Sequence, residues 1–347
     1  MRGIVKVEEK HNRILPPQTW KNSTTHFLNT IESDWYRKLC LLQDFISVNT
    51  IMFYQAKNMK TIHLPITTGA VSSPMGLGSD SKPVKIKMFN KEMYLADSMQ
   101  FMLEYGCRMH PDGVYYIMPS FRGEDADDRH LCQFYHSEAE IAGNLSDVML
   151  LVEEYIKYLC VELLNKFEDL EAICGNVRHI EKMITLKEMP KITFDEAEKI
   201  LAKYEDAIKY NKLGFRTLTR DGEKILMNTF DGMVWVQNYD QLAVPFYQAI
   251  NPYNQKTTLN ADLLFGIGEV VGCGQRHTGS QELLKALERH KVSERDYEWY
   301  IQMKERYPME TAGFGMGIER FLLWITCNDD IRNFELLPRR NGIHICP

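Results

Sequence analysis

The sequence lacks any long run of apolar residues. Nowhere in its 347 residues do 18 apolar residues follow one another, and the first 20 residues contain no continuous apolar stretch. A helix that spans a bilayer needs about 20 such residues, and a secretory signal peptide needs an apolar core. We therefore expect no membrane segment and predict a cytoplasmic protein.

Paired cysteines and an excess of positive charge are also missing. The eight cysteines include no C-x-x-C pair, so the sequence predicts neither a zinc site nor a disulfide framework. Lysine and arginine total 41 against 47 acidic residues, a formal net charge of −6. This balance argues against a general affinity for the nucleic-acid backbone, although it allows a local basic pocket.

Helical and strand-like segments occur in separate blocks. Residues 35–58 and 147–167 have a helical pattern, and strand-like segments run from 84 to 140 and from 233 to 276. Residues 168–212 are charged and read as a helical insertion. The pattern predicts an α+β fold.

A glycine-rich motif stands near the C-terminus, where residues 311–324 read "TAGFGMGIERFLLW". Gly313, Gly315 and Gly317 alternate with apolar residues, so in a strand they face one side and leave it without side chains. Arg320 follows where a buried helix is predicted to begin. The motif suits either a tightly packed core strand or a surface for a flat ligand such as a nucleotide.

A second block, residues 118–140, reads "MPSFRGEDADDRHLCQFYHSEAE" and predicts a hairpin with a charged tip. Arg122 and Glu124 share one face of the first strand, and Phe134 can share that face from the second. A planar cation, a carboxylate and an aromatic ring suit a phosphate, an amine and a purine. A charged hairpin tip is more often simply solvated.

A third block, residues 260–276, reads "NADLLFGIGEVVGCGQR". It brings Asp262 and Glu269 into one glycine-rich strand region, and two carboxylates suit a Mg²⁺ that bridges phosphates. Arg276 ends the block with a fork for a carboxylate or an amide oxygen. The alternative for these charges is a surface salt bridge.

The three blocks together resemble the class II aminoacyl-tRNA synthetases. "SFRGE…RHLCQF" resembles their motif 2, "AGFGMGIERFLLW" their motif 3 and "FYQAKNMKTIHLPITTG" their motif 1. "GIGEVVGCGQR" and "ERDYEWY" look like the asparaginyl enzymes, whereas "LADSMQ" is closer to archaeal-type aspartyl enzymes. The resemblance implies a catalytic domain over residues 35–347, an antiparallel β-sheet flanked by helices.

This resemblance also implies ATP and Mg²⁺ as cofactors. Arg122 would hold the α-phosphate, and Phe134 and Arg320 would enclose the adenine. Asp262 and Glu269 would hold the metal. The implied catalytic residues are Arg122, Glu269 and Arg320, and the implied ATP-binding residues are Arg122, Glu124, Arg129, His130, Phe134, Gly317 and Arg320.

For the amino acid, the resemblance implies Ser98 and Gln100 at the α-amino group and Arg276, with Gln275, at the side chain. His277, next to Arg276, is a candidate proton acceptor. The proline of motif 1, here Pro65, lies at the dimer interface in that family, so we expect a homodimer.

Two departures from the family shape the functional prediction. Only about 34 residues precede the first helix, too few for the OB-fold that reads the anticodon, so we expect residues 1–34 to form no such domain. Leu103 stands where aspartyl enzymes have a lysine, which puts aspartate recognition of that type in doubt. A core that keeps adenylation resembles the asparagine synthetases derived from this family.

The sequence therefore predicts an ATP-dependent, AMP-forming amide ligase. It would adenylate aspartate or a related amino acid and pass it to ammonia or an amine, without anticodon recognition or a membrane. One alternative is an amino-acid-activating enzyme that delivers the acyl group to a peptide, a carrier protein or tRNA. Another is a regulatory paralogue without turnover.

Overall fold

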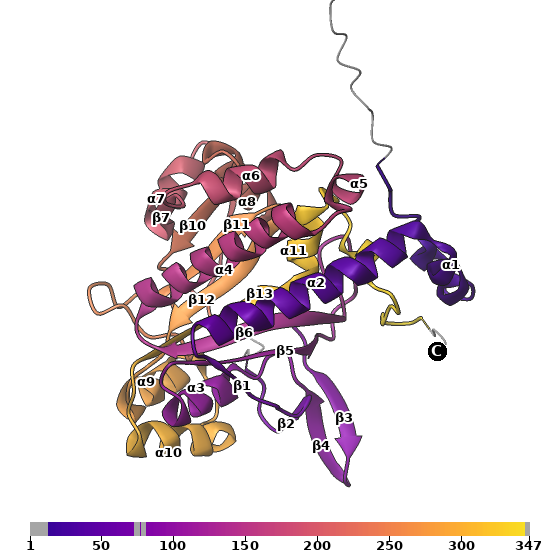
Figure 1. The fold of residues 1–347 in the computed structure, drawn as a ribbon. Coiled ribbons are helices and arrows are strands. Elements are labelled where there is room, and N and C mark those ends of the chain that lie inside the picture. Colours follow the sequence, from indigo (N-terminus) through magenta and orange to yellow (C-terminus); the bar gives the residue numbers. More distant parts are fainter. Residues whose placement is uncertain (1–12, 73–76, 78–80, 344–347) are drawn as a thin grey trace, which may run out of the picture.

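An eight-stranded sheet forms the centre of the molecule in the computed structural model, which describes residues 13–72, 77 and 81–343 (Figure 1). The strands run antiparallel from β5 to β10, and the short edge strands β1 and β7 pair in parallel. The strand order is β1 (Lys60–Thr61), β5 (Val114–Phe121), β6 (Gln133–Ala142), β13 (Thr311–Gly317), β12 (Gly268–Gln275), β11 (Asn260–Phe265), β10 (Met233–Gln237) and β7 (Lys191–Thr193).

Two long helices, α2 (Asp34–Ala56) and α4 (Leu145–Lys166), lie side by side across one face of this sheet (Figure 1). Asn144 starts α4 with a capping box that also uses Asp147. The predicted helices at 35–58 and 147–167 are confirmed to within two residues. Tyr54 and Tyr155 of these helices hydrogen-bond to Ser137 of β6, so Ser137 faces the helices.

Because side chains alternate along a strand, the neighbours of Ser137 point the other way. Glu138 and Glu140 therefore face the side of the sheet that α2 and α4 do not cover. The candidate site lies on this second face, beside a small sheet of β2 (Thr67–Thr68), β4 (Lys91–Leu95) and β3 (Val84–Met88).

The remaining helices gather in groups around the sheet. α3, α9 and α10 lie together at one end, at the lower left in Figure 1, and α11 follows β13 directly. Their bounds are α3 (Gln100–Met109), α9 (Ser280–His290), α10 (Glu298–Arg306) and α11 (Ile318–Ile325), with α1 (His26–Glu32) and the 3-10 turns η1 (Thr19–Lys21), η2 (Glu294–Tyr297) and η3 (Ile331–Phe334).

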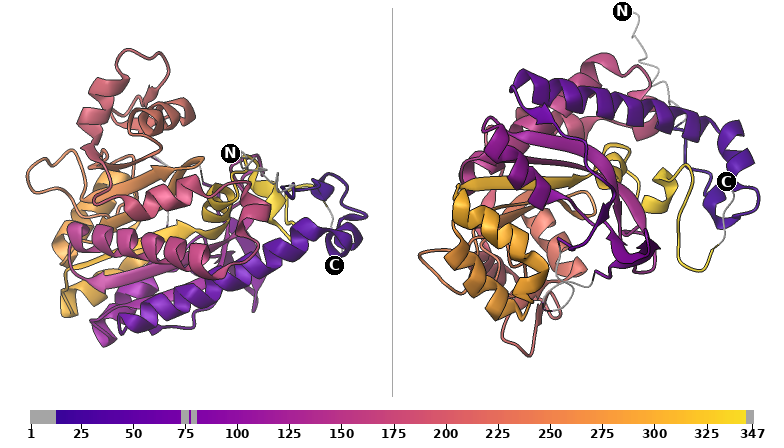
Figure 2. Two further views of the ribbon diagram at one scale, coloured as in Figure 1. Left: turned by 45° about the horizontal axis from the view of Figure 1, so that its top comes forward. Right: turned by 90° about the horizontal axis from the view of Figure 1, so that it is seen from below.

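The predicted insertion at 168–212 is only partly helical. Besides α5 (Leu170–Cys174), α6 (Arg178–Thr185) and α7 (Phe194–Leu201), it supplies β7 and β8 (Ile208–Tyr210). β8 pairs with β9 (Arg216–Leu218), and α8 (Arg220–Thr229) completes a small subdomain that projects from the body in Figure 2. β7 and β8 have three residues each, too few to show a strand period in the sequence.

The α+β fold class is confirmed, and the ends of the chain add little to it. Residues 13–34 contain η1 and α1 and no strand in their described structure; Trp20 ties them to the core by donating its indole N–H to Asn333 Oδ1 at 2.8 Å. No helix among the described residues is long and apolar enough to cross a bilayer.

Candidate active site

A bare patch of backbone forms the floor of the site. Gly274 of β12 lies opposite Gly313 of β13, and Gly272 lies opposite Gly315. Neither strand therefore supplies a side chain over this area. The neighbouring positions across the sheet are acidic: Glu138 and Glu140 on β6 and Asp262 on β11.

These glycines make room for specific side chains. A Cβ on Gly313 would lie 1.8 Å from Glu140 Oε2, and one on Gly274 would lie 2.0 Å from Gln248 Oε1. Gly317 differs, because the atoms nearest to its added Cβ are 3.7 Å away, on Arg320. Of Gly313 and Gly317, only Gly317 is free of cross-strand side chains as predicted, whereas the side chain of Glu140 lies over Gly313.

One cavity of ≈190 Å³ collects most of the residues predicted to bind ATP. The loop between β5 and β6 and the start of β6 supply its wall on one side, and β12, the end of β13 and the start of α11 supply the other. The predicted residues that line it are Arg122, Arg129, His130, Phe134, Glu269, Gly317 and Arg320. Segments about 200 residues apart in sequence thus meet here, as the interpretation required.

Three guanidinium groups, of Arg122, Arg129 and Arg320, line this cavity. The Nε atoms of Arg122 and Arg129 are buried and have no hydrogen-bond partner in the described part of the chain. Arg320 donates to the backbone carbonyl of Glu269 at 2.6 Å. Burial lowers the pKa of Arg320, and the positive charges of Arg122 and Arg129 add to this effect. Buried donors without acceptors and clustered cations suit a polyanion.

The purine end of the cavity is less complete than predicted. The Arg122 guanidinium lies 5.5 Å from the centroid of the Phe134 ring, so one face of that ring meets Arg122. Glu124 is not among the lining residues; its Oε2 accepts a hydrogen bond from the Lys82 backbone N–H at 2.9 Å. Its predicted contact with ATP stays a prediction.

Asp262 and Glu269 converge as predicted. A Cβ on Gly272 would lie 2.9 Å from Glu269 Oε1 and 3.5 Å from Asp262 Oδ1. Burial raises the pKa of Asp262 well above its usual value, and the charge of Glu269 raises it further. This carboxylate pair fits a Mg²⁺ that takes its other ligands from phosphates and water. No group of three or more potential protein ligands occurs among the described residues.

A third carboxylate, Glu223 of α8, was missed in the sequence. It accepts a hydrogen bond from Arg129 Nη2 at 2.6 Å, and burial raises its pKa although Arg129 opposes that shift. Glu223 thus connects the small subdomain to the wall of the cavity.

Arg276 directly follows β12 and is almost fully buried, at 1% exposed. Its Nε and Nη2 donate to the two Glu140 oxygens at 3.1 and 3.0 Å. Its Nη1 donates to Gln248 Oε1 at 3.2 Å, and Nη2 reaches Gln100 Oε1 at 3.4 Å. The Tyr247 ring stands over the guanidinium, with 5.2 Å to the centroid. Of these partners, the sequence had indicated only Gln100.

Glu138 is the anionic group next to Ser98. The Ser98 hydroxyl donates to Glu138 Oε2 at 2.6 Å, and Tyr116 donates to the same oxygen. Burial alone would raise the pKa of Glu138, but hydrogen bonds from His136, Ser98 and Tyr116 outweigh it and lower that pKa. An ionised carboxylate here suits an ammonium group, and Glu138 accepts a hydrogen bond from Ser98, one of the two residues predicted to meet that group.

Two predicted residues lie outside the pocket. Gln275 Oε1 accepts from the Leu145 N–H at 3.2 Å, and its Nε2 donates to Glu310 at 3.2 Å; because it precedes Arg276 in the strand, it points to the other face. His277 is 2% exposed, with Nε2 at 3.0 Å from the Phe246 carbonyl, and burial lowers its pKa to about 4. None of these hydrogen bonds involves Arg276 or Glu140, and both assignments stay predictions.

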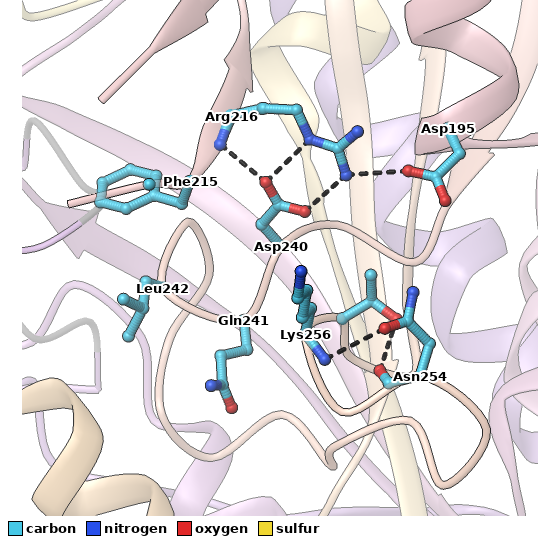
Figure 3. Close-up of a pocket in the computed structure, with 10 residues that line it drawn as sticks. Asp195, Phe215, Arg216, Asp240, Gln241, Leu242, Asn254 and Lys256 are labelled. Atoms are coloured by element: carbon cyan, nitrogen blue, oxygen red, sulfur yellow. Dashed lines mark hydrogen bonds and ion pairs between the residues drawn. The ribbon is translucent and has the colours of Figure 1, made fainter. Parts of the chain in front are cut away.

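A larger cavity, of ≈640 Å³, lies away from these groups beside β9 (Figure 3). Arg216 Nε and Nη2 donate to Asp240 at 2.9 and 2.7 Å, and Nη2 also meets Asp195. These ion pairs between Arg216 and Asp240, here called the clasp, hold β9 to the start of the loop 240–257. The loop carries Tyr247 and Gln248 to Arg276, so the cavity borders a supporting contact of the site.

Comparison with known proteins identifies the family. The family described as tRNA synthetases class II (D, K and N) matches residues 23–341. The chain belongs to the class II tRNA synthetases. The family resemblance seen in the sequence is thereby confirmed.

Several relatives of this chain are asparagine enzymes. Asparagine–tRNA ligases of Pyrococcus furiosus and Thermococcus gammatolerans are 31% and 29% identical over 279 residues, or 79% of this chain. The chain spans 61% and 62% of their lengths. The asparaginyl-tRNA synthetase of Pyrococcus horikoshii complexed with asparaginyl-adenylate has a TM-score of 0.82 at 26% identity and covers 91% of this chain and 71% of its own. The Entamoeba histolytica enzyme, at 20% identity and a TM-score of 0.81 over 96% of this chain and 74% of its own, supports the fold alone.

Proposed function

We propose that this class II synthetase activates an amino acid with a side-chain carboxamide, asparagine, by converting it to an aminoacyl-adenylate. The observation that carries the proposal is the buried pair of Arg276 and Glu140. The names of the relatives at about 30% identity point to the same amino acid.

A carboxamide matches this pair better than a carboxylate does. Its oxygen accepts from Arg276, and its N–H group donates to Glu140. A side-chain carboxylate would meet the like charge of ionised Glu140 in a buried place, which is costly. Arg276 already contacts the amide oxygens of Gln100 and Gln248, and a substrate carboxamide replaces one of these contacts with an equivalent one.

Adenylation needs little more than positioning and charge stabilisation. The α-carboxylate oxygen attacks the α-phosphorus of ATP, a new P–O bond forms, and the bond to the β-phosphate oxygen breaks to release pyrophosphate. Arg122 would offset the negative charge that develops on the α-phosphate. Arg129 and His130 would bind the outer phosphates, and Phe134 and Arg320 the adenine.

Asp262 and Glu269 would hold Mg²⁺, which when bound would neutralise phosphate charge. Glu138 would bind the α-ammonium group of the amino acid. Its pKa is lowered, so it is ionised at neutral pH. Ser98 orients Glu138 through its hydroxyl.

The acceptor is proposed to be tRNA, because the curated relatives are named asparagine–tRNA ligases. The amide ligase expected from the sequence, which would adenylate aspartate and pass it to ammonia, is supported less well. Aspartate, the substrate of such an amide ligase, would bring a second carboxylate toward Glu140. Transfer of asparagine to another amine uses the same adenylate and remains the second candidate.

A homodimer is proposed from the exposed face of α2. Val48, Ile51 and Met52 of α2 are 46%, 41% and 49% exposed. Pro65, which marks the family's dimer interface in the sequence, follows β1 at the end of the sheet. A second copy related by twofold symmetry would cover these apolar side chains.

Pyrophosphate exchange into ATP over a panel of amino acids tests the proposal. We expect exchange with asparagine and much less with aspartate. Arg122→Ala should slow it about a hundredfold, whereas Arg178→Ala, at an exposed position at the start of α6, should not change it. Equal exchange with aspartate, or full activity of Arg122→Ala, would contradict the assignment. Adding tRNA or ammonia in turn then identifies the acceptor by the acylated product.

A further inference from the structure

A second buried ion pair lies beside the one that forms the side-chain pocket. Lys304 of α10 donates to Glu104 Oε2 of α3 at 2.6 Å, and both side chains are fully buried. The Tyr300 hydroxyl donates to the other Glu104 oxygen. Lys304 also donates to the backbone carbonyl of His277 at 2.5 Å. His277 directly follows Arg276, so this second pair anchors the chain next to the pocket.

The two ion pairs affect each other through charge. Burial raises the pKa of Glu140 to about 7; Arg276 opposes this shift, and the like charge of Glu104 adds to it. Lys304 and Tyr300 both donate to the fully buried carboxylate of Glu104. The protonation of Glu140 near neutral pH thus depends on a carboxylate that does not line the pocket.

Charged and titratable groups approach Glu140 from four elements. Arg276 directly follows β12, and Glu138 lies on the same face of β6 as Glu140. The others are Glu104 and Cys107 of α3 and Tyr300 and Lys304 of α10. The two cations Arg276 and Lys304 thus accompany the two carboxylates of Glu140 and Glu104. Removing any one of these four charges changes the electrostatic potential at the other three.

We infer that the Glu104–Lys304 pair determines whether the pocket of Glu140 and Arg276 accepts a carboxamide or a carboxylate. The inference rests on the proposed activation of asparagine. Ionised Glu140 accepts an N–H from a carboxamide and repels a carboxylate. Protonated Glu140 instead donates its O–H to a carboxylate oxygen. Glu104 and Lys304 are positioning residues for specificity, since they act through Glu140 and do not touch the substrate.

The first test compares exchange with asparagine and with aspartate over about three pH units around neutrality. In the unaltered protein the ratio of the two kcat/KM values should rise with pH, with a midpoint near the Glu140 pKa of about 7. Glu104→Gln removes the neighbouring like charge. This variant should lower the midpoint of the pH profile by about one pH unit. At pH values below that midpoint, it should raise the ratio of kcat/KM for asparagine to kcat/KM for aspartate about tenfold.

Two further variants make this test specific. Glu104→Gln with Lys304→Met removes both charges and should give a midpoint between the other two, because the attraction of Lys304 is lost as well. This neutral variant also serves if Glu104→Gln alone does not fold. Glu310→Gln removes an exposed carboxylate near Gln275, and water should screen its effect, leaving the midpoint unchanged.

A measurement without substrate separates this inference from the proposed function. The infrared band of the protonated Glu140 carboxyl, assigned by its loss in Glu140→Gln, should disappear on raising the pH through the same midpoints in each variant. If no amino acid supports pyrophosphate exchange, the proposed function is wrong. The infrared titration then still tests whether Glu104 and Lys304 set the protonation of Glu140. A midpoint that Glu104→Gln and the double variant leave unchanged, by either measurement, overturns it.

Discussion

Gly313→Ala is the sharpest perturbation of the site, because one added carbon meets both a buried carboxylate and a backbone oxygen. The new Cβ would lie 1.8 Å from Glu140 Oε2 and 2.6 Å from the Ala139 backbone oxygen. The carboxylate has to retreat by about 1.5 Å to restore an ordinary van der Waals contact. The Ala139 oxygen cannot retreat, because β6 is paired with β13 at this position.

The cost has two parts. Strain from the overpacked strand contributes about 1–3 kcal/mol. Displacement of Glu140 also weakens its two bonds to Arg276, at 3.1 and 3.0 Å in a fully buried pair, and a hydrogen bond between charged groups contributes about 1.5–3 kcal/mol. We expect the free energy of unfolding to fall by about 3 kcal/mol. The KM for asparagine should rise about ten- to a hundredfold.

Urea denaturation and pyrophosphate-exchange kinetics measure these two effects. Gly317→Ala is the matched control, since its Cβ has no neighbour closer than 3.7 Å and its φ of −70° suits alanine. That variant should keep its stability within about 0.5 kcal/mol and lose affinity for ATP instead. A Gly313→Ala protein with unchanged stability and unchanged KM for asparagine would refute the argument.

Three other perturbations probe the rest of the site. Asp262→Asn should raise the Mg²⁺ concentration needed for half-maximal exchange about tenfold, and an unchanged Mg²⁺ requirement would count against the metal assignment. Arg216→Ala removes the side chain that pairs with Asp240, so the free energy of unfolding should fall by about 2 kcal/mol or more. In exchange kinetics it should raise the KM for the amino acid and not for ATP; equal changes in both KM values would contradict the proposed support of the site by Arg216 and Asp240. Val48→Asp should convert dimers to monomers in sedimentation velocity, whereas Tyr210→Asp on β8 should not, and a monomeric unaltered protein would exclude the proposed interface.

The cavity proposed to bind ATP could be predicted from the sequence because its signals are local. The hairpin register, in which Phe121 lies opposite Gln133, follows from the length of the loop between two recognisable strands. It brings Arg122 and Phe134 together without information from distant parts of the chain. Arg320 follows the glycine strand directly, so its place at the start of a helix was also readable.

The amino-acid pocket depends on contacts that no local pattern contains. Glu140 faces Gly313 because β6 pairs with β13, more than 170 residues later, and Gln248 comes from an irregular loop. The sequence shows Glu138 and Glu140 only as two acidic residues in a strand. Strand alternation does apply to Gln275 and Arg276: neighbours point to opposite faces, and this rule alone places Gln275 on the face away from Arg276.

The clasp between Arg216 and Asp240 makes the small subdomain a support for substrate selection rather than an independent appendage. The tip of its β8–β9 hairpin is open, since a Cβ on Gly214 would meet nothing within 4 Å. Peptide tags or longer loops can therefore be accommodated at the tip. Shortening the hairpin to its base would remove Arg216 and release the loop that presents Tyr247 and Gln248. Insertions are therefore confined to residues 211–215, because the next residue, Arg216, lies opposite Tyr210 at the loop end of the ladder and already holds Asp240.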